Sequence, residues 1–469
     1  MRYKIIILFA LYLNYSFAQK YTPTYFPKKD FIEDVHFLKG KVFHIHPIFF
    51  ESKFAIEWNK QYNQIIDNCQ SDSITFNECY IYLSSLLSKL QDGHTNFSFP
   101  YSERIKYMKN GGTTMPFTIT IKNSKIFFNQ YFANTKEANI SAYEIVSINN
   151  ISSDSILKRL QPFYGAKNKS ITNSIIEKYF GAYFWTVFGE FPQYNVEVLK
   201  NGKIKLLELK PVNNSEYFAL KNKKYPKLKE EKYKISFWDK NNFAYLKIKS
   251  FADKKTLSVF IKEAFDTIKT VRCKNLIIDI RNNFGGTSDA VDTLLSYLTN
   301  KPYKQYLSIG LRTSDDIKLK YKNTKPELYN KISHLSDTLF YYTDSMLLKE
   351  PCFRKNKFTG NIFVLVNTKT FSAASTFAGI MKQYKLGKII GESGTGGTIK
   401  YYGDFLFFKL PNTKMDFFIS TKQFIQFGGN NLNKGVYPDI LVKKNNNIKE
   451  IINELKTNAN NGYKQCGRR

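Results

Sequence analysis

Two apolar segments, each ending at a tight turn, constrain the fold of this chain most strongly. The first, Leu276–Ile280, breaks at Gly285-Gly286, and the second, Ile362–Val366, leads to Ser372. Short apolar runs of this kind, alternating with helical patterns, are typical of the buried strands of an α/β sheet. The chain beyond about residue 235 is therefore predicted to form an α/β domain.

Ser372 stands between an apolar strand and a helical pattern, a place that would hold its side chain above the edge of a sheet. The N-terminus of a helix there offers unpaired N–H groups and the positive end of the helix dipole. Ser372 can then act as a nucleophile, with the N–H of Ala373 facing the oxyanion that the attack creates. The alternative is that Ser372 only caps the helix, as serines often do.

The Gly285-Gly286 turn can supply a second oxyanion donor. Glycine adopts positive φ without strain, so the backbone can point an N–H outward at this position. Such a donor would complete a two-point oxyanion hole, in which each donor is worth about 3–4 kcal/mol of transition-state stabilisation. The alternative is an ordinary turn in an α/β sheet.

Residues 1–18 have the pattern of a secretory signal peptide. A basic start, Met1–Lys4, precedes an apolar core, Ile5–Leu13, and a small-residue cleavage site ends at Ala18. No later apolar run approaches the roughly 18–20 residues of a membrane-spanning helix, and no cysteine stands beside the cleavage site. We expect the mature chain to be exported, periplasmic or extracellular, with neither a transmembrane nor a lipid anchor.

The formal net charge of +31 raises the question of a polyanionic partner. However, the lysines are mostly spread along the chain, and lysine, asparagine and isoleucine are all abundant, as an A/T-biased coding sequence produces. We therefore expect no nucleic-acid site. The five cysteines show no metal-ligand spacing, and His44 with His46 lacks further ligands, so we expect neither a metal nor an organic cofactor.

Composition and periodicity divide the mature chain into regions. Residues 19–110 are predicted to be helical; Thr75 and Glu78 form a capping box, and the helix ends at Asp92-Gly93, which places His94 on a turn. Residues 113–215 change to short strands that resemble part of a PDZ domain with an insertion at 161–192. The rest is predicted to be a lysine-rich linker over 216–234, a catalytic domain over 235–456 with an irregular segment at 301–358, and a disordered tail over 457–469.

Several spaced motifs together resemble the S41 serine peptidases, the carboxyl-terminal-processing and tricorn-core proteases. The motifs are Asp279-x-Arg281-x-Asn283-x-Gly285-Gly286, Thr370-x-Ser372-Ala373-Ala374, Ile389-Ile390-Gly391-Glu392 and Gly435-Val436-x-Pro438-Asp439. The resemblance covers about residues 240–455 and implies an α/β, crotonase-like (ClpP/crotonase-type) core with an inserted PDZ-like domain. It also implies Ser372 as the nucleophile and an oxyanion hole formed by Ala373 with Gly285 or Gly286.

The resemblance offers two sources for the general base. In the carboxyl-terminal-processing branch, a lysine stands five residues after the glutamate of the Gly-Glu motif; this chain has Gly397 there, and Lys400 follows as an alternative base. In the tricorn-like branch, a histidine precedes the PDZ-like domain, and Asp92-Gly93-His94-Thr95 is similar to that motif. Because an imidazole titrates near neutral pH, it suits removal of a serine proton. We therefore expect His94 to be the base, and the other four histidines to be surface or packing residues.

The chain departs from the family pattern at three positions. Gly93 replaces a serine before the histidine, Leu432 replaces a glutamate before the closing motif, and Ser375 replaces another common acid after the nucleophile. The sequence therefore indicates no acid that would orient His94, which puts tautomer control of this base in question.

Three functions are compatible with these features. The first is an exported serine endopeptidase of the tricorn-like branch, which holds peptides or unfolded proteins by strand addition and cuts them through Ser372 and His94. The second is a catalytically impaired, peptide-binding relative of these peptidases. The third is a cationic adhesion or scaffold protein, whose binding to polyanions would fall steeply with salt and would not depend on Ser372. The sequence does not indicate an oligomeric state.

Overall fold

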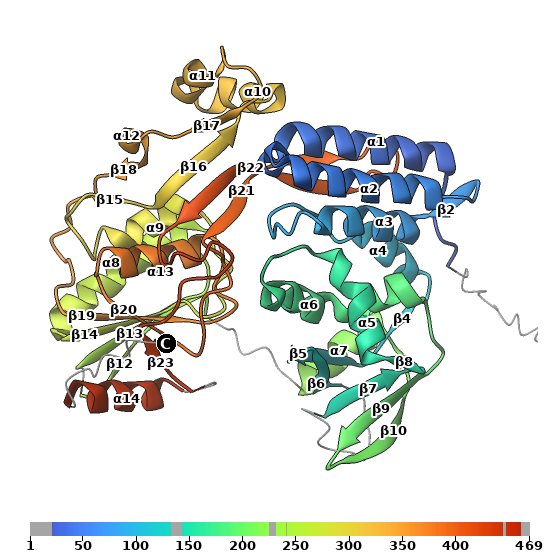
Figure 1. Ribbon diagram of the computed structural model, residues 1–469. Helices are drawn as coiled ribbons and strands as arrows, with labels where there is room; N and C mark the ends of the chain where they lie inside the picture. Colours follow the sequence, from blue (N-terminus) through green and yellow to red (C-terminus); the bar gives the residue numbers. More distant parts are fainter. Residues whose placement is uncertain (1–20, 133–142, 225–230, 241, 444–446, 461–469) are drawn as a thin grey trace, which may run out of the picture.

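The computed structural model describes residues 21–132, 143–224, 231–240, 242–443 and 447–460 (Figure 1). The predicted signal peptide and the last part of the predicted tail lie outside these residues. Helix α14 (Ile448–Asn460) runs into the region predicted as a disordered tail. Within the described residues, no helix is both long enough and apolar enough to span a bilayer.

The N-terminal region is helical, as predicted. Its elements are the paired strands β1 (Tyr25–Pro27) and β2 (Ser73–Thr75), helices α1 (Lys28–Ile45), α2 (Ser52–Asn68), α3 (Phe76–Ser88) and α4 (Tyr101–Lys109), and the 3-10 turn η1 (Pro47–Phe50). Thr75 and Glu78 form the predicted capping box, because each side chain accepts a hydrogen bond from the backbone N–H of the other residue. This box fixes the start of α3, the helix that precedes His94.

A sheet of short antiparallel strands follows. Its order is β10-β9-β7-β6-β5, with β8 beside β7; the strands are β5 (Phe117–Lys122), β6 (Lys125–Tyr131), β7 (Glu144–Ile148), β8 (Ile151–Ser152), β9 (Tyr194–Lys200) and β10 (Lys203–Leu209). Helices α5 (Ser153–Leu160) and α6 (Lys169–Phe188), with the 3-10 turn η2 (Gln161–Phe163), pack on this sheet through a core shared with α1 and α3. The region predicted as an insertion is therefore η2, α6 and the loop between them.

The predicted linker over 216–234 is partly helical where the structure describes it. Helix α7 (Asn214–Lys224) occupies its start, after the short strands β4 (Thr113–Thr114) and β11 (Val212–Asn213) have paired, and strand β12 begins at Tyr233. Because α7 buries none of its side chains, it lacks the apolar stripe by which sequence patterns reveal a helix. Residues 225–230 lie outside the described chain.

The second half of the chain contains the predicted α/β sheet. Its order is β12-β13-β14-β19-β20-β23, with all neighbours parallel except β12 and β13; the strands are β12 (Tyr233–Trp238), β13 (Phe243–Ile248), β14 (Asn275–Asp279), β19 (Asn361–Val366), β20 (Lys388–Gly391) and β23 (Ile440–Leu441). Helices α8 (Lys254–Val271), α9 (Ser288–Leu295) and α13 (Ala373–Gln383) cover one face, and α14 covers the other (Figure 1). Because β14 and β19 are parallel neighbours, the turns that follow them meet at one edge of the sheet.

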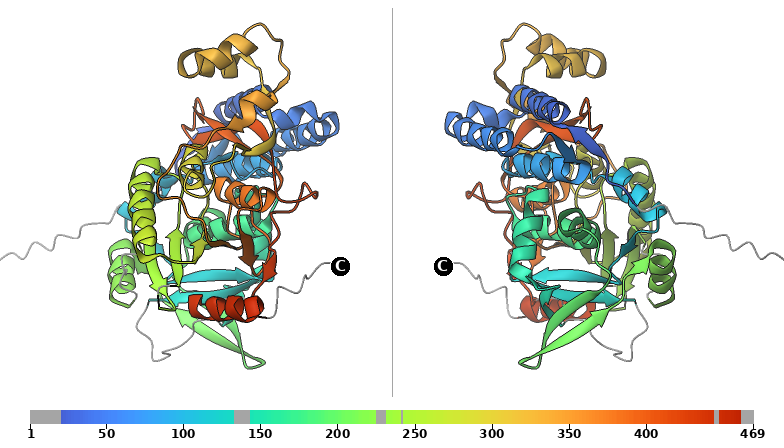
Figure 2. Two further views of the ribbon diagram at one scale, coloured as in Figure 1. Left: turned by 90° about the vertical axis from the view of Figure 1, so that its left-hand side faces the viewer. Right: turned by 90° about the vertical axis from the view of Figure 1, so that its right-hand side faces the viewer.

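A second sheet connects this half to the N-terminal helices. Its order is β17-β16-β22-β21, with β3 (Asn96–Phe97) also on β22; the strands are β16 (Tyr306–Arg312), β17 (Leu339–Tyr341), β21 (Lys400–Lys409) and β22 (Asp416–Gln426). Residues 301–358, predicted to be irregular, contain β16 and β17, the small strands β15 (Tyr303–Lys304) and β18 (Leu348–Lys349), and helices α10 (Asp315–Thr324), α11 (Pro326–Ile332) and α12 (Asp344–Leu347). Figure 2 shows α10 and α11, in gold, at one end of the molecule.

The β21–β22 hairpin reaches across to α1, as Figure 1 shows. At its turn, the backbone N–H groups of Asn412 and Thr413 donate to the two carboxylate oxygens of Asp34 on α1, each at 2.8 Å, and the Thr413 hydroxyl also donates to Asp34. Asp34 is completely buried. The two halves of the chain are therefore joined by main-chain pairing and by a buried carboxylate.

Candidate active site

Ser372 lies in the turn between β19 and α13, with φ 52° and ψ −132°. A residue other than glycine is strained at positive φ, and such strain is found most often at functional sites. The Ser372 side chain makes no capping hydrogen bond to the helix. Instead, its Oγ lies 3.0 Å from Nε2 of His94. The capping interpretation of this serine is therefore excluded by its geometry.

The turn that presents Ser372 is fastened to the turn that follows β14. The Thr370 hydroxyl donates to the carbonyl oxygen of Ile280, and the Phe371 N–H donates to that of Asn283. Gly285 has φ 97°, and a Cβ placed on it would lie 2.8 Å from Cβ of Ser372. Only glycine fits so close to the serine, so the Gly285-Gly286 motif is required by the packing of the two turns.

His94 reaches Ser372 from the N-terminal region because the turn after α3 is docked on β22. Asn96 and Phe97 form β3, which pairs with β22, and Thr95 Oγ1 accepts a hydrogen bond from the Ser420 N–H. The imidazole stacks on the ring of Phe371, with centroids 4.9 Å apart. A Cβ on the preceding Gly93 would lie 2.8 Å from this phenylalanine ring, so the ring occupies the space that a larger residue would need.

Asp92 is a buried carboxylate beside the imidazole. Its Oδ1 lies 3.5 Å from Nδ1 of His94 and accepts the His94 backbone N–H. Its Oδ2 accepts from the hydroxyls of Thr95 and Ser420 and lies 3.2 Å from Nε2 of His46. Burial alone would raise the pKa of Asp92, but hydrogen bonds and charge from His46 and His94 hold the pKa of this carboxyl well below its usual range. Asp92 therefore stays ionised.

The tautomer of His46 follows from its two contacts. The backbone N–H of Ile48 donates to Nδ1 of His46, so this nitrogen carries no proton and Nε2 is the protonated one that donates to Asp92. His46 is completely buried. The expectation of a surface or packing histidine therefore missed its contact with Asp92, which comes from 46 residues away in the chain.

Two backbone N–H groups of the turns that meet at Ser372 have no acceptor among the described residues, those of Ala373 and Gly286. The N–H of Gly285 donates to the side-chain oxygen of Asn283 at 2.8 Å. Ala373 starts helix α13, where free N–H groups and the helix dipole favour negative charge. Of the predicted oxyanion donors, Ala373 and Gly286 therefore remain available and Gly285 is occupied.

The structure does not bring the other sequence candidates to Ser372. Nζ of Lys400, the alternative base, forms an ion pair with Glu51 at 2.8 Å. Ser375 is buried in a polar network with Thr395, Gln426 and the carbonyl of Gly397. Leu432 is 43% exposed. The carboxylate that lies beside His94 is Asp92, which stands two residues before it in the sequence.

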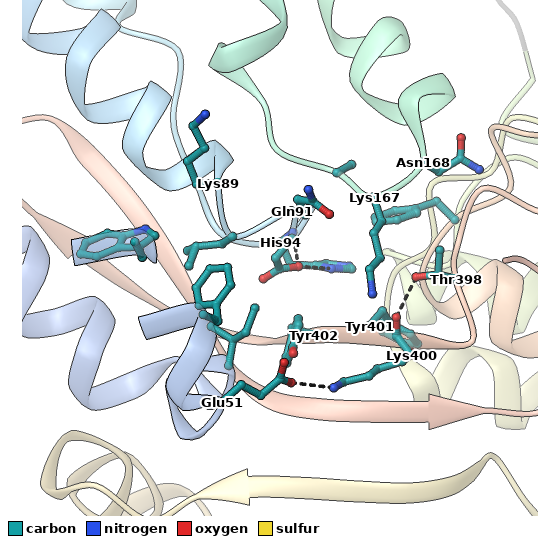
Figure 3. A pocket seen from close by; sticks show the side chains of 18 of the residues that line it. Glu51, Lys89, Gln91, His94, Lys167, Asn168, Thr398, Lys400, Tyr401 and Tyr402 are labelled. Carbon is teal, nitrogen blue, oxygen red and sulfur yellow. Dashed lines mark hydrogen bonds and ion pairs between the residues drawn. The ribbon is translucent and has the colours of Figure 1, made fainter. Parts of the chain in front are cut away.

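A cavity of about 470 Å³ opens beside His94 (Figure 3). It lies between the N-terminal helices, the loop before α6 and the start of β21. Its lining has an apolar part with Phe54, Trp58 and Leu90, and a polar part with His94, Lys167 and Lys400. The cavity is thus continuous with the imidazole that contacts Ser372.

Comparisons with known proteins give a family for the second half of the chain and structures of similar fold. Residues 242–442 match the model of peptidase family S41. The fold is similar to that of mature CPAF, with 14% identity, a TM-score of 0.61 and coverage of 88% of this chain and 92% of that chain. It is also similar to a mutant of CPAF, with 14% identity, a TM-score of 0.63 and coverage of 94% and 99%. As the sequence motifs predicted, the chain carries, over residues 242–442, a domain of the S41 family of serine-type peptidases.

Proposed function

We propose that the protein is an exported serine endopeptidase that hydrolyses peptide bonds in peptides or unfolded proteins. The observation that carries this proposal is the 3.0 Å contact between Ser372 Oγ and His94 Nε2, which joins residues 278 positions apart. A strained serine that does not cap its helix, facing an imidazole, has the geometry of a nucleophile and its base. The S41 domain supplies the reaction class, proteolysis.

The proton moves along this contact. Ser372 Oγ attacks the carbonyl carbon of the scissile peptide bond as Nε2 of His94 takes the hydroxyl proton. The tetrahedral intermediate collapses when His94 returns this proton to the leaving amine, which gives an acyl-enzyme on Ser372. Water, deprotonated by His94, then attacks the ester and releases the second product.

Asp92 supplies the carboxylate that the sequence motifs did not indicate. For Nε2 to accept a proton, His94 must carry its other proton on Nδ1, and this nitrogen faces Oδ1 of Asp92 at 3.5 Å. Catalytic hydrogen bonds are often long in an unliganded enzyme and shorten when substrate binds. Within the described residues Nδ1 is buried and makes no hydrogen bond, so this contact must shorten for Asp92 to hold the productive tautomer and to stabilise the imidazolium that forms.

The oxyanion faces the N–H groups of Ala373 and Gly286. Both donors belong to turns that are hydrogen-bonded to each other, so their positions are fixed before the reaction. Preorganised donors of this kind stabilise the developing charge without reorganisation at the moment of reaction.

The proposal also includes four features that the sequence predicts: the tricorn-like branch, the crotonase-like core, the PDZ-like insert and export. A general base that comes from the region before the antiparallel sheet supports assignment to the tricorn-like branch. The three-layer α/β half supports a crotonase-like core, and the antiparallel sheet with α5 supports a PDZ-like insert. The pattern of residues 1–18 supports export to the periplasm or the exterior.

The test is degradation of casein by the mature chain beside Ser372→Ala and His94→Ala. The proposal expects the parent to cut and both variants to lose at least about 10³-fold in rate, because nucleophile and base act as one unit. Ser152→Ala, which removes a serine that does cap a helix, and His44→Ala, which removes an exposed histidine, are matched controls. Both controls should retain activity.

Other outcomes separate the alternatives. A parent that binds casein without cutting it would support the impaired peptide-binding relative. Loss of cutting in Ser372→Ala alone would assign the proton transfer to a group other than His94. Salt-sensitive adhesion to polyanions that is unchanged in Ser372→Ala would support the cationic scaffold instead.

A further inference from the structure

We propose that the cavity beside His94 contains a subsite for a carboxylate of the substrate, formed by Lys167 together with Lys400. The inference rests on the proposed peptidase function and names its substrate class: chains with an acidic group close to the scissile bond. Three observations carry it, namely the position of Lys167, the engagement of Glu51 and Asp92 with other groups, and the continuity of the cavity with the imidazole of His94.

Lys167 lies in the loop between η2 and α6, where it lines the cavity. Figure 3 shows its ammonium group pointing between His94 and Lys400, whereas that of Lys89 points away. Among the described residues, no hydrogen bond or ion pair joins the Lys167 side chain to another group. In the described part of the chain the Lys167 ammonium therefore has no direct ion-pair partner, and the nearby negative charge, that of Glu51, is already paired with Lys400.

The surroundings make this position unfavourable for an unpaired cation. Lys167 itself is exposed at the cavity mouth. Even so, partial burial first, and the nearby charge of Lys400 second, lower the pKa of Lys167 below its ordinary value, against the opposing charge of Glu51. A bound carboxylate would relieve both effects, because it pairs with the ammonium and offsets the repulsion between the two lysines.

The acidic groups that line the cavity are mostly engaged elsewhere. Glu51 pairs with Lys400 at 2.8 Å, and Asp92 accepts hydrogen bonds from His46, Thr95 and Ser420. The remaining acid, Glu57, is exposed on α2. Lys167, Lys89 and Glu57 are thus the charged lining groups without an ion pair among the described residues. Of the two lysines, Lys167 points toward His94 (Figure 3).

Two further features suit a carboxylate. Lys400 can share its ammonium between Glu51 and a ligand, since an ammonium has three donors. Asn168, which also lines the cavity, caps the N-terminus of α6, so the positive end of this helix dipole lies at the same wall. A substrate chain that reaches Ser372 past His94 would place a side chain or terminus near the scissile bond in this cavity.

The first experiment profiles cleavage of a peptide library, prepared by digesting a proteome with an unrelated peptidase, with the sites identified by mass spectrometry. We expect Asp or Glu to be enriched at one position within about three residues of the cut, the reach of a short extended segment. Two synthetic peptides from one such site, with Glu or Gln at that position, should differ by about tenfold in kcat/KM.

Lys167→Gln should reduce this preference to near unity while it leaves cleavage of the Gln peptide unchanged. Lys169→Gln is the matched control, because it removes the same charge two residues away, at the exposed start of α6 and outside the cavity lining. Absence of an acidic preference, or its persistence in Lys167→Gln, would overturn the subsite. Equal loss of all cleavage in Lys167→Gln would also overturn it, since the lysine would then belong to the proton-transfer machinery.

The acidic group can come from a side chain or from a chain terminus, and C-terminal amidation of the peptides distinguishes these sources. If only free C-termini are preferred, the subsite binds the terminal carboxylate. If the parent cuts nothing, the proposed peptidase function fails, and binding of the Glu and Gln peptides, followed by fluorescence anisotropy, then decides the subsite. Tighter binding of the Glu peptide that is lost in Lys167→Gln supports it, and equal binding overturns it.

Discussion

At the scale of single residues, the site depends on contacts between residues that stand far apart in the chain. The strand and helix patterns around residue 372 and the family motifs indicated Ser372, Ala373 and His94, and the structure places the serine hydroxyl against the imidazole. Asp92 belongs to the motif around His94, but the family pattern places its acids at positions 375 and 432, so the sequence did not indicate a role for Asp92. The contact of His46 with Asp92 depends on the docking of η1 and has no signal in the sequence.

A substitution of Asp92 tests the role of single residues in the proposed site. Asp92→Asn keeps the shape of the side chain but removes the charge that stabilises the imidazolium and the acceptor that fixes its tautomer. We expect kcat to fall by about 10²–10⁴-fold with little change in KM. Steady-state kinetics on a peptide substrate measure this effect.

Ser420→Ala is the control for this substitution, because it removes one hydrogen-bond donor to Asp92 and leaves the contact of Asp92 with His94 intact. It should lower kcat by less than about tenfold. An Asp92→Asn variant that is as folded as the parent and retains most of its kcat would show that the carboxylate plays no part in orienting the base.

At the scale of helices and strands, sequence patterns predicted an element well where it buries a regular stripe or a continuous run of apolar side chains. Strands β14 and β19 were predicted to within one residue at each end, since both are buried between helices on the two faces of their sheet. Strand β16 was missed, because what makes it a strand is its pairing with β22, more than a hundred residues further on. Tertiary pairing of this kind overrides local preference.

A substitution of Asp34 tests how strongly the hairpin β21–β22 is held on helix α1. Asp34→Asn replaces an acceptor of two backbone N–H groups by a side chain with half the acceptor capacity and an added donor. We expect the free energy of unfolding to fall by about 2–3 kcal/mol, because buried donors at the hairpin turn lose their charged partner. Urea unfolding measures the change, with Glu33→Gln as the control, since Glu33 makes only an exposed contact with the same turn. Equal stability of the two variants would contradict the role of Asp34.

At the scale of the whole molecule, buried or paired carboxylates make the stability of the protein depend on pH in the acidic range. Burial would raise the pKa of Asp404, but Lys422 at 2.6 Å and Lys320 at 3.0 Å lower it, although 34% of the Asp404 side chain stays exposed. The pKa of Asp92 is lowered as well. A carboxyl group whose pKa is lower in the folded than in the unfolded chain stabilises the fold above the unfolded pKa of about 3.9, and this contribution is lost as the pH falls.

We therefore expect these groups to contribute a constant stability between about pH 5 and 8, and the Tm to decline below about pH 4. The pKa of Lys422 is raised by Asp404 against the opposing effect of burial, so its contribution is lost only at pH values above the ordinary lysine range. Thermal unfolding between pH 3 and 8 tests this, and Asp404→Asn should show a shallower decline in acid than the parent. An equal slope of Tm against pH in acid for the two proteins would contradict the prediction.

The placement of the base and the nucleophile also bears on when this chain can act. His94 is delivered by a turn near the start of the chain, whereas Ser372 and the strand that docks this turn lie near its end. When three-quarters of the polypeptide has been synthesised, His94 is therefore present but Ser372 is not. If the proposed function holds, a cell that makes this protein is shielded from the activity throughout synthesis, because the last strands must fold onto the first helices before His94 meets Ser372.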